Sequence, residues 1–141
     1  MLSLAQATKI VDIALNRARE LNCKPLTVAV LDAGGHLIAL KREDGAAIMR
    51  PQIAQAKAWG ALGMGHGGRE LARRAANAPA FFTALADISG GRIAPVPGGV
   101  LIRDDGGKIL GAVGISGDEP DKDEACAVQG IEAVALRADG G

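Results

Sequence analysis

Aromatic residues are scarce in this chain of 141 residues, which has one tryptophan, two phenylalanines and no tyrosine. Proteins that hold single-stranded nucleic acids stack successive bases on aromatic side chains, and this sequence has too few for such a surface. Sixteen basic and sixteen acidic residues give a formal net charge of zero. A protein held to nucleic acid by phosphate contacts needs an excess of positive charge. The composition therefore predicts no nucleic-acid partner.

Cysteine is also rare, and the two present, Cys23 and Cys126, cannot form a disulfide framework. Such low usage is typical of a reducing compartment. The motifs HExxH, CxxC and CxxCH are absent, which argues against zinc hydrolysis, thioredoxin-like redox chemistry and covalent haem attachment. The glycines fit neither the dinucleotide-binding nor the phosphate-loop pattern. Cys126 stands between alanines, and we interpret it as a small core residue.

Long hydrophobic runs are missing as well. Charged residues such as Lys9, Asp12 and Arg17 interrupt the apolar N-terminal segment, so no signal peptide is expected. No stretch approaches the length of a membrane span. We expect a cytoplasmic protein with no membrane partner, and the length predicts a single domain over residues 1–141.

Glycine, in contrast, is abundant, and much of it lies in residues 97–117, PGGVLIRDDGGKILGAVGISG. The part DDGGKILG resembles DAGGHLIA in residues 32–39, and each follows a run of apolar, largely β-branched residues. Both segments predict a β-hairpin whose glycines adopt positive φ in the turn. Gly98 and Gly99 precede a strand and have no turn to explain them, which makes them candidates for close approach of a ligand.

Helices are predicted before, between and after the two hairpins. Ser3 and Gln6 form a capping box at the start of the first helix. Residues 50–64, about 69–76 and a segment beginning at Pro79 supply the middle helices, and Pro120 begins the last one. The predicted apolar stripes are Leu4, Ala7, Val11, Ala14, Ala18 and Leu21 in the first helix and Ala127, Ile131, Val134 and Ala135 in the last. This order favours an α+β fold with an antiparallel sheet, and the nearly continuous apolar strands predict that helices or another subunit cover both faces.

Several segments together resemble the GlcG/HbpS family, also called the haem-degrading domain family. They are KREDGAAIMR, the pair Lys57–Ala58, PVPGGVLI, GAVGISG and the acidic helix start DEPDKDEACA. The resemblance extends over essentially the whole chain. It implies a profilin-like fold with a five-stranded antiparallel sheet flanked by helices, and assembly into homo-oligomers. Family members include a haem-binding sensor protein and domains fused to PduO-type corrinoid adenosyltransferases, so haem is the cofactor that the resemblance implies.

A polar cluster at the junctions between strands and helices is the candidate binding site. Arginine pairs bidentately with carboxylates, and glycine N–H groups can face an anion, so a small carboxylate or the propionates of haem would suit such a pocket. Each of these charges can equally be a solvated residue at the end of an element. The candidate ligand-binding residues are Arg42, Asp44, Arg50, Arg69, Gly98 and Gly99.

The two histidines are the candidate metal ligands and general bases. His36 occupies the position of Lys108 in the overlaid hairpins, which favours a solvated residue leaving a turn. His66 lies in GMGHGG, just before a predicted helix start, and is the candidate haem iron ligand. A mobile connection between helices explains the same glycines equally well.

Two classes of function follow from these observations. The first is a small-ligand-binding protein for haem or a related tetrapyrrole. The alternative is an enzyme or accessory subunit, of lyase or isomerase type, acting on a small carboxylate or hydroxy acid. In that alternative the arginines hold the anion and Asp44 or His66 moves a proton. A purely structural oligomer is a third possibility.

Overall fold

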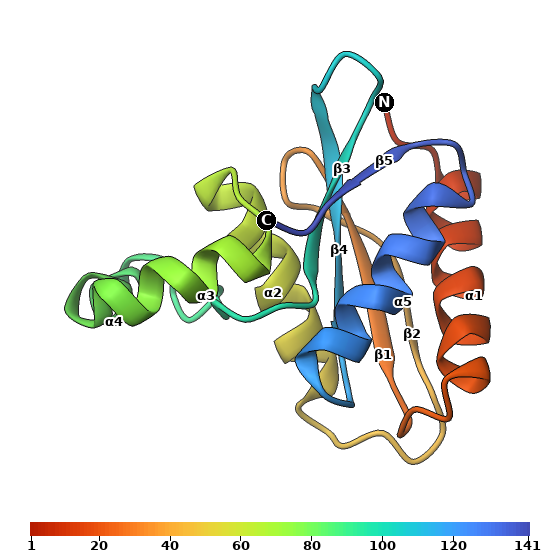
Figure 1. The fold of residues 1–141 in the computed structure, drawn as a ribbon, viewed down its shortest axis with the longest axis horizontal. Coiled ribbons are helices and arrows are strands. Elements are labelled where there is room, and N and C mark those ends of the chain that lie inside the picture. The colour runs from red at the N-terminus through yellow and green to blue at the C-terminus, as the bar shows by residue number, and fades with distance from the viewer.

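The computed structural model describes all residues, 1–141 (Figure 1). Five helices and five strands follow one another along the chain. Their order is α1 (Leu4–Glu20), β1 (Thr27–Asp32), β2 (Leu37–Arg42), α2 (Arg50–Met64), α3 (Gly68–Asn77), α4 (Pro79–Ile88), β3 (Gly99–Arg103), β4 (Ile109–Ser116), α5 (Pro120–Glu132) and β5 (Arg137–Asp139). No helix combines the length and the apolar character that crossing a bilayer requires.

The strands form one antiparallel sheet in the order β2-β1-β4-β3-β5, which confirms the predicted fold class. The two predicted hairpins are β1–β2 and β3–β4, and their turns share one design. In each, an aspartate Oδ1 accepts the N–H of the fourth residue on: Asp32 from His36 at 3.0 Å and Asp104 from Lys108 at 2.9 Å. The second glycine of each pair has positive φ, as the sequence predicted.

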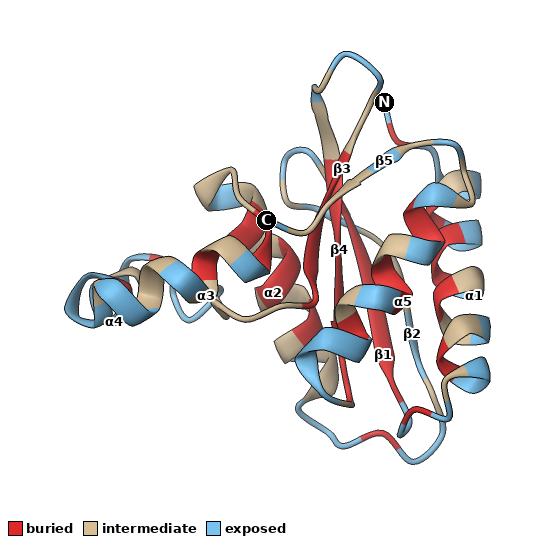
Figure 2. Cartoon of the chain, viewed as in Figure 1, coloured by how far each residue is buried: buried red, intermediate tan, exposed pale blue.

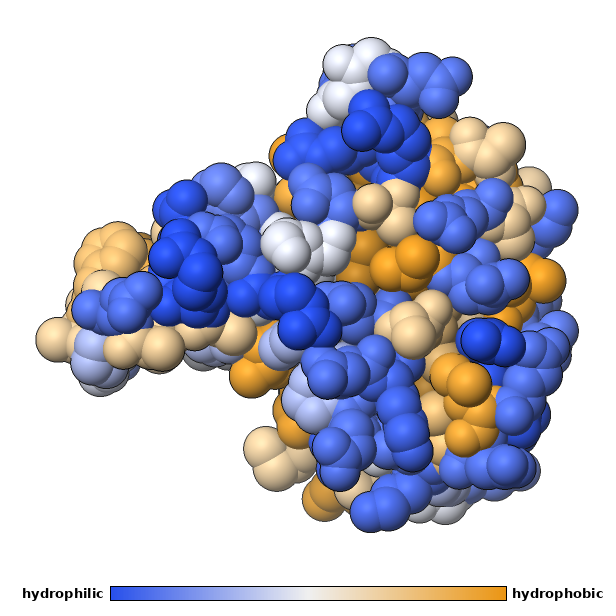
Figure 3. Space-filling view, viewed as in Figure 1, coloured by the Kyte–Doolittle hydropathy of each residue, from blue (hydrophilic) through white to orange (hydrophobic).

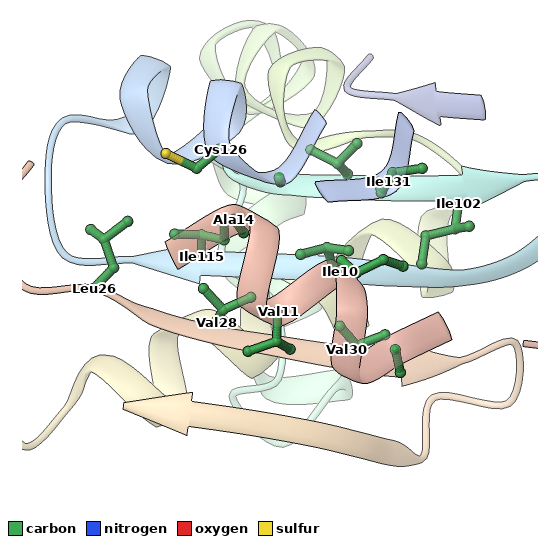
Figure 4. Packing of buried hydrophobic residues seen from close by; sticks show 14 of the residues in the cluster. Ile10, Val11, Ala14, Leu26, Val28, Val30, Ile102, Ile115, Cys126 and Ile131 are labelled. Carbon is green, nitrogen blue, oxygen red and sulfur yellow. The ribbon is translucent and has the colours of Figure 1, made fainter. Parts of the chain in front are cut away.

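Helices cover both faces of the sheet, so alternate strand residues enter two different cores (Figure 2). Val28 and Val30 of β1 face α1 and α5, in the larger core shown in Figure 4. Leu31 instead packs against Ala58 and Ala61 of α2 on the other face. This double coverage explains why the strands are apolar at nearly every position.

The packing of α2 on the sheet depends on the absence of a side chain at Gly114 in β4. A Cβ atom placed there would lie 1.8 Å from the carbonyl oxygen of Ala54 and 3.0 Å from the amide nitrogen of Ala58. The helix backbone therefore lies directly on the strand, closer than any larger residue would allow.

The end of the last helix differs from the prediction. Helix α5 ends at Glu132, so Val134 and Ala135 do not belong to its buried stripe; Ala135 is exposed. Ala135 adopts positive φ, at 59°, and the chain then turns back into β5. Strand β5 has only three residues and pairs with β3 at the edge of the sheet, and no local pattern in the sequence indicated it.

Helices α3 and α4 form an arm that projects away from the sheet (Figure 1). Helix α3 packs against α2, β3 and α4, whereas α4 packs against α3 alone among the helices and strands. The start of α3 is held by the C-terminal residues, because the Arg69 amide donates to the Gly140 carbonyl at 3.0 Å. The glycines before α3 leave room for this contact: a Cβ at Gly67 would lie 2.1 Å from the carbonyl carbon of Gly140.

Candidate functional site

Three of the five main hollows of the surface meet at Trp59, on the outer side of α2. The largest of the three, about 380 Å³, is lined by polar residues of α2, by Gly35 of the first hairpin and by Arg92. A second, about 130 Å³, shares Trp59 and Gly35 with it and adds Gly34 and Leu62. The third, about 180 Å³, is largely apolar and reaches Leu85 and Ile88 of α4. The single tryptophan of the chain therefore forms a common wall.

The indole of Trp59 is held between the hairpin turn and the segment after α4. The guanidinium carbon of Arg92 lies 4.0 Å from the centre of the indole, a cation–π distance. Arg92 is itself oriented by its Nε, which donates to the Ser89 carbonyl at 2.7 Å. On the hairpin side, a Cβ at Gly35 would lie 2.8 Å from Trp59 Nε1. An aromatic surface and a cation thus stand side by side at one hollow.

His36 follows the two glycines that line these hollows, and a carboxylate orients its ring. Its Nδ1 lies 3.1 Å from Asp32 Oδ1, and the side chain is 80% exposed. Hydrogen bonds from the His36 and Gly34 amides lower the pKa of Asp32, so this group is a carboxylate and only accepts. The Nδ1 therefore acts as the donor in this contact, and Nε2 makes no hydrogen bond within the chain. Histidine ligands to metals are commonly oriented by a carboxylate in this way.

His66, the predicted iron ligand, lies elsewhere. It is half-buried at the connection between α2 and α3, where its amide donates to the Ala61 carbonyl at 3.2 Å. It lines none of the five main hollows. Gly65, on one side of it, caps α2 in the left-handed conformation. Gly67, on the other side, lies against Gly140.

The predicted polar cluster is divided between three places. Arg42 and Asp44 line an open hollow of about 490 Å³ at the ends of α1 and β2, where Arg42 Nη1 donates to the Ala46 carbonyl at 2.9 Å. Arg69 lies at the start of α3, and its guanidinium donates to Asp121 and Glu124 of α5. Neither place includes the glycine pair.

Arg50, Gly98 and Gly99 do come close to one another, around a buried lysine of α2. Arg50 Nη1 donates to Ser116 Oγ at 3.0 Å, and its charge is one cause of the lowered pKa of Lys57. A Cβ at Gly98 would lie 2.9 Å from Lys57 Nζ, and one at Gly99 would lie 2.4 Å from the Lys57 carbonyl oxygen. Gly99 thus admits the backbone of α2, whereas Gly98 makes room for the Lys57 side chain. None of the five main hollows reaches either glycine.

Lys57 forms a buried ion pair with Asp123 of α5. The Nζ lies 3.2 Å from Asp123 Oδ2, and the two side chains are 5% and 1% exposed. Burial raises the pKa of Asp123 to about 6, while the nearby ammonium opposes this rise. Burial also lowers the pKa of Lys57. The pair joins the helices on opposite sides of the sheet and is shielded from solvent.

The comparisons with known proteins place this architecture in a family. The family model described as "Haem degrading protein HbpS-like" matches residues 2–132. The chain belongs to the HbpS-like family. The crystal structure of a double mutant of Streptomyces reticuli HbpS is 30% identical, with a TM-score of 0.82 over 94% of this chain and 86% of the solved one.

Other members of the HbpS-like family have the same fold. The PduOC structure, solved as a haem complex, is 27% identical, with a TM-score of 0.85 over 96% of each chain. ORFY of Klebsiella pneumoniae is 25% identical, with a TM-score of 0.85 over 94% of this chain and 90% of that one. The corrinoid adenosyltransferase PduO of Citrobacter freundii is 28% identical over 136 residues. These cover 96% of this chain but only 40% of that enzyme.

Sequence reasoning missed two features of this HbpS-like chain. Trp59 stands out in the sequence as the only tryptophan. No local pattern predicts that it lies opposite the hairpin glycines or beside Arg92, which is 33 positions later in the sequence. Lys57 and Asp123 belong to two segments that each resemble the family, Lys57–Ala58 and DEPDKDEACA. Nothing in either segment indicated that the two residues form a pair. A lysine within a helix otherwise rich in alanine was the available signal.

Proposed function

We propose that this chain is a binding protein for haem or a related tetrapyrrole, which it holds in the hollows around Trp59. The relatives support this class of ligand, because the family model describes haem-degrading proteins and the PduOC structure is a haem complex. Tetrapyrroles are flat and largely apolar and carry carboxylate substituents. Their binding requires an aromatic or apolar wall, a cation and, where iron is present, an axial ligand.

The residues around Trp59 fit these three requirements. The indole supplies the wall, and the Arg92 guanidinium supplies a cation for a propionate. His36 lines none of the five main hollows, but it directly follows Gly35, which does, and it is the histidine next to this site in the sequence, with an exposed imidazole. The Arg92 guanidinium stacked on Trp59 at the hollow is the observation that carries the proposal. When bound, haem would supply the iron and its redox chemistry, and the protein residues would orient the ring and limit its exposure to water.

A hemin titration of the purified protein, followed by visible absorption, tests this proposal. We expect a saturable Soret band at one haem per chain, and a shifted band with weaker binding for His36→Ala. Arg92→Gln should weaken binding by about 10- to 100-fold, which is the usual contribution of a hydrogen bond to a charged group. His66→Ala is the matched control, and its titration should equal that of the unmodified protein.

Two outcomes would contradict the proposal at different levels. Loss of the band in His66→Ala with no change in His36→Ala would refute the placement of the ligand but retain haem binding. A featureless, non-saturating titration would refute haem binding itself. The carboxylate hypothesis would then rest on the hollow lined by Arg42 and Asp44, and a thermal-shift screen with organic acids would test it.

A further inference from the structure

Two arginines near the start of α2 have no carboxylate partner. Neither Arg42 nor Arg50 forms a salt bridge within the chain. Arg42 Nη1 donates to the Ala46 carbonyl at 2.9 Å, and the amide of Arg50 donates to the Ala47 carbonyl at 3.0 Å. The same short turn thus holds the Arg42 guanidinium close to the start of the helix. An anion placed between the two arginines would relieve the repulsion of their charges.

The first turn of α2 adds to this positive charge. Met49, the residue before the helix, offers no capping side chain, and the first turn contains no acidic residue. The amide of Gln52 points toward the helix start and donates to no backbone carbonyl. The helix dipole places about half a positive charge at this end. Such an end favours an oxyanion, provided that other groups complete the site.

Thr27 supplies a group of this kind. It is fully buried, and its Oγ1 is the one buried side-chain polar atom of the chain without a hydrogen-bond partner. Thr27 pairs with Arg42 of β2 and with Ser116 of β4, so these three side chains form one row across the sheet. Because the next residue, Val28, faces α1 and α5, the row faces α2. Arg50 Nη1 reaches the row from α2 and donates to Ser116 Oγ at 3.0 Å.

The unpartnered hydroxyl of Thr27 is unfavourable unless a ligand uses it. A buried polar group without a partner usually destabilises a protein. A hydroxyl can donate its hydrogen to an oxygen of an anion that the two arginines hold. Solvent does not reach Thr27 Oγ1, so the anion must first displace Arg50 from Ser116. The Ser116 hydroxyl is then also available to the anion.

We propose that the start of α2 binds a compact oxyanion, a carboxylate or a phosphate group, between Arg42 and Arg50. The two guanidinium groups donate to its oxygens, and the Thr27 and Ser116 hydroxyls donate from the sheet. Hydrophilic side chains predominate at this end of the molecule, at the bottom of Figure 3. The site lies on the side of α2 that faces the sheet, about two and a half turns before Trp59, and is independent of the tetrapyrrole proposed above.

Thermal unfolding at constant ionic strength, with inorganic phosphate or sodium acetate in place of sodium chloride, tests the proposal. We expect a saturable rise in the melting temperature with at least one of the two anions, and the stronger response identifies the class of ligand. Arg50→Gln should weaken binding of that anion by about 10- to 100-fold. Arg137→Gln removes an exposed arginine that also lacks a salt bridge, and this matched control should leave the response unchanged.

Thr27→Val distinguishes anion binding from a purely structural role. Valine has a similar size and no unpaired hydroxyl, so without the anion this variant should melt at the same temperature as the unmodified chain or higher. It should nevertheless bind the anion about 10-fold more weakly, and a structural role alone does not produce these two changes together.

Circular dichroism must show unchanged helix content for each variant, and Arg42→Gln replaces Arg50→Gln if that variant unfolds. Absence of a saturable response to both anions would overturn the proposal. A response that survives both Arg50→Gln and Thr27→Val would overturn it as well. So would a response that Arg137→Gln weakens equally, because binding would then depend on surface charge in general.

Discussion

Replacing Lys57 with methionine is expected to lower the free energy of unfolding by about 3–5 kcal/mol at pH 7, the usual cost of removing one partner from a buried ion pair. Methionine fills a similar volume, so the loss comes from Asp123, whose charge stays buried without its ammonium partner. Urea unfolding followed by circular dichroism measures the effect. A replacement of both residues, Lys57→Met with Asp123→Asn, should recover most of the stability, since an asparagine Oδ1 can still accept the Asp118 amide.

The pH dependence of the Lys57→Met variant gives a second readout of the same pair. The pKa of Asp123 in the folded protein is about 6, above its ordinary value of 3.8, and loss of the ammonium raises it further. A raised folded pKa contributes stability that is present below the unfolded pKa and is lost as pH rises through the folded pKa. The deficit caused by the substitution should therefore be smaller at pH 5 than at pH 7.

The matched control for this prediction is Lys41→Met. Lys41 pairs with Asp12 at 2.7 Å, but both side chains are about half exposed. Surface pairs contribute about 0–1 kcal/mol, so the same substitution there should have little effect. Equal losses for the two variants would show that burial of the Lys57 pair has no special energetic role.

Gly114→Ala is expected to destabilise the protein by about 3 kcal/mol or more, at the upper end of the range for overpacking. The added Cβ would lie 1.8 Å from the Ala54 carbonyl oxygen. Because the obstacle is helix backbone, no side-chain rotation relieves it, and α2 must move away from β4. That movement also displaces Trp59, so hemin binding should weaken in the same variant. Urea unfolding and the hemin titration measure the two effects.

Gly63→Ala, on the outer side of α2, is the control for this prediction. Its added Cβ would lie 3.5 Å from the Trp59 ring, an ordinary contact. Alanine is more favourable than glycine within a helix by about 0.8–1.0 kcal/mol, so this variant should be slightly more stable than the unmodified chain. If Gly114→Ala were as stable as Gly63→Ala, close contact between α2 and β4 would not be what holds the sheet and helix together.

Much of the fold was predictable because its signals are local. The capping box of Ser3 and Gln6 forms as expected, with both hydrogen bonds present. The two aspartate and glycine turns define the hairpins, since each turn satisfies its own backbone groups within a few residues. Ala135 and β5 were missed because a left-handed alanine and a three-residue edge strand depend on packing against β3 rather than on local preference.

The candidate site was less predictable, because it depends on contacts between distant segments. The sequence correctly indicated that His36 leaves a turn at the surface. It did not show that the turn glycines meet Trp59 across a hollow. Gly98 and Gly99 were predicted to admit a ligand. In the fold, Gly99 admits the Lys57 carbonyl of α2, and Gly98 lies against the Lys57 side chain. Arg42 and Arg69 are adjacent to strand or helix ends in the sequence and lie apart in space.

The sequence by itself determined the hairpin turns, the helix starts and the double-sided burial of the strands. Each depends on dihedral preference, capping or apolar periodicity within a few residues. Only the tertiary structure decided which polar groups meet. The pairing of Lys57 with Asp123, the stacking of Arg92 on Trp59 and the exposure of Phe81 and Ile88 all follow from how α2, α5 and the arm are placed on the sheet. That placement is set by the summed packing of two cores, which no single segment encodes.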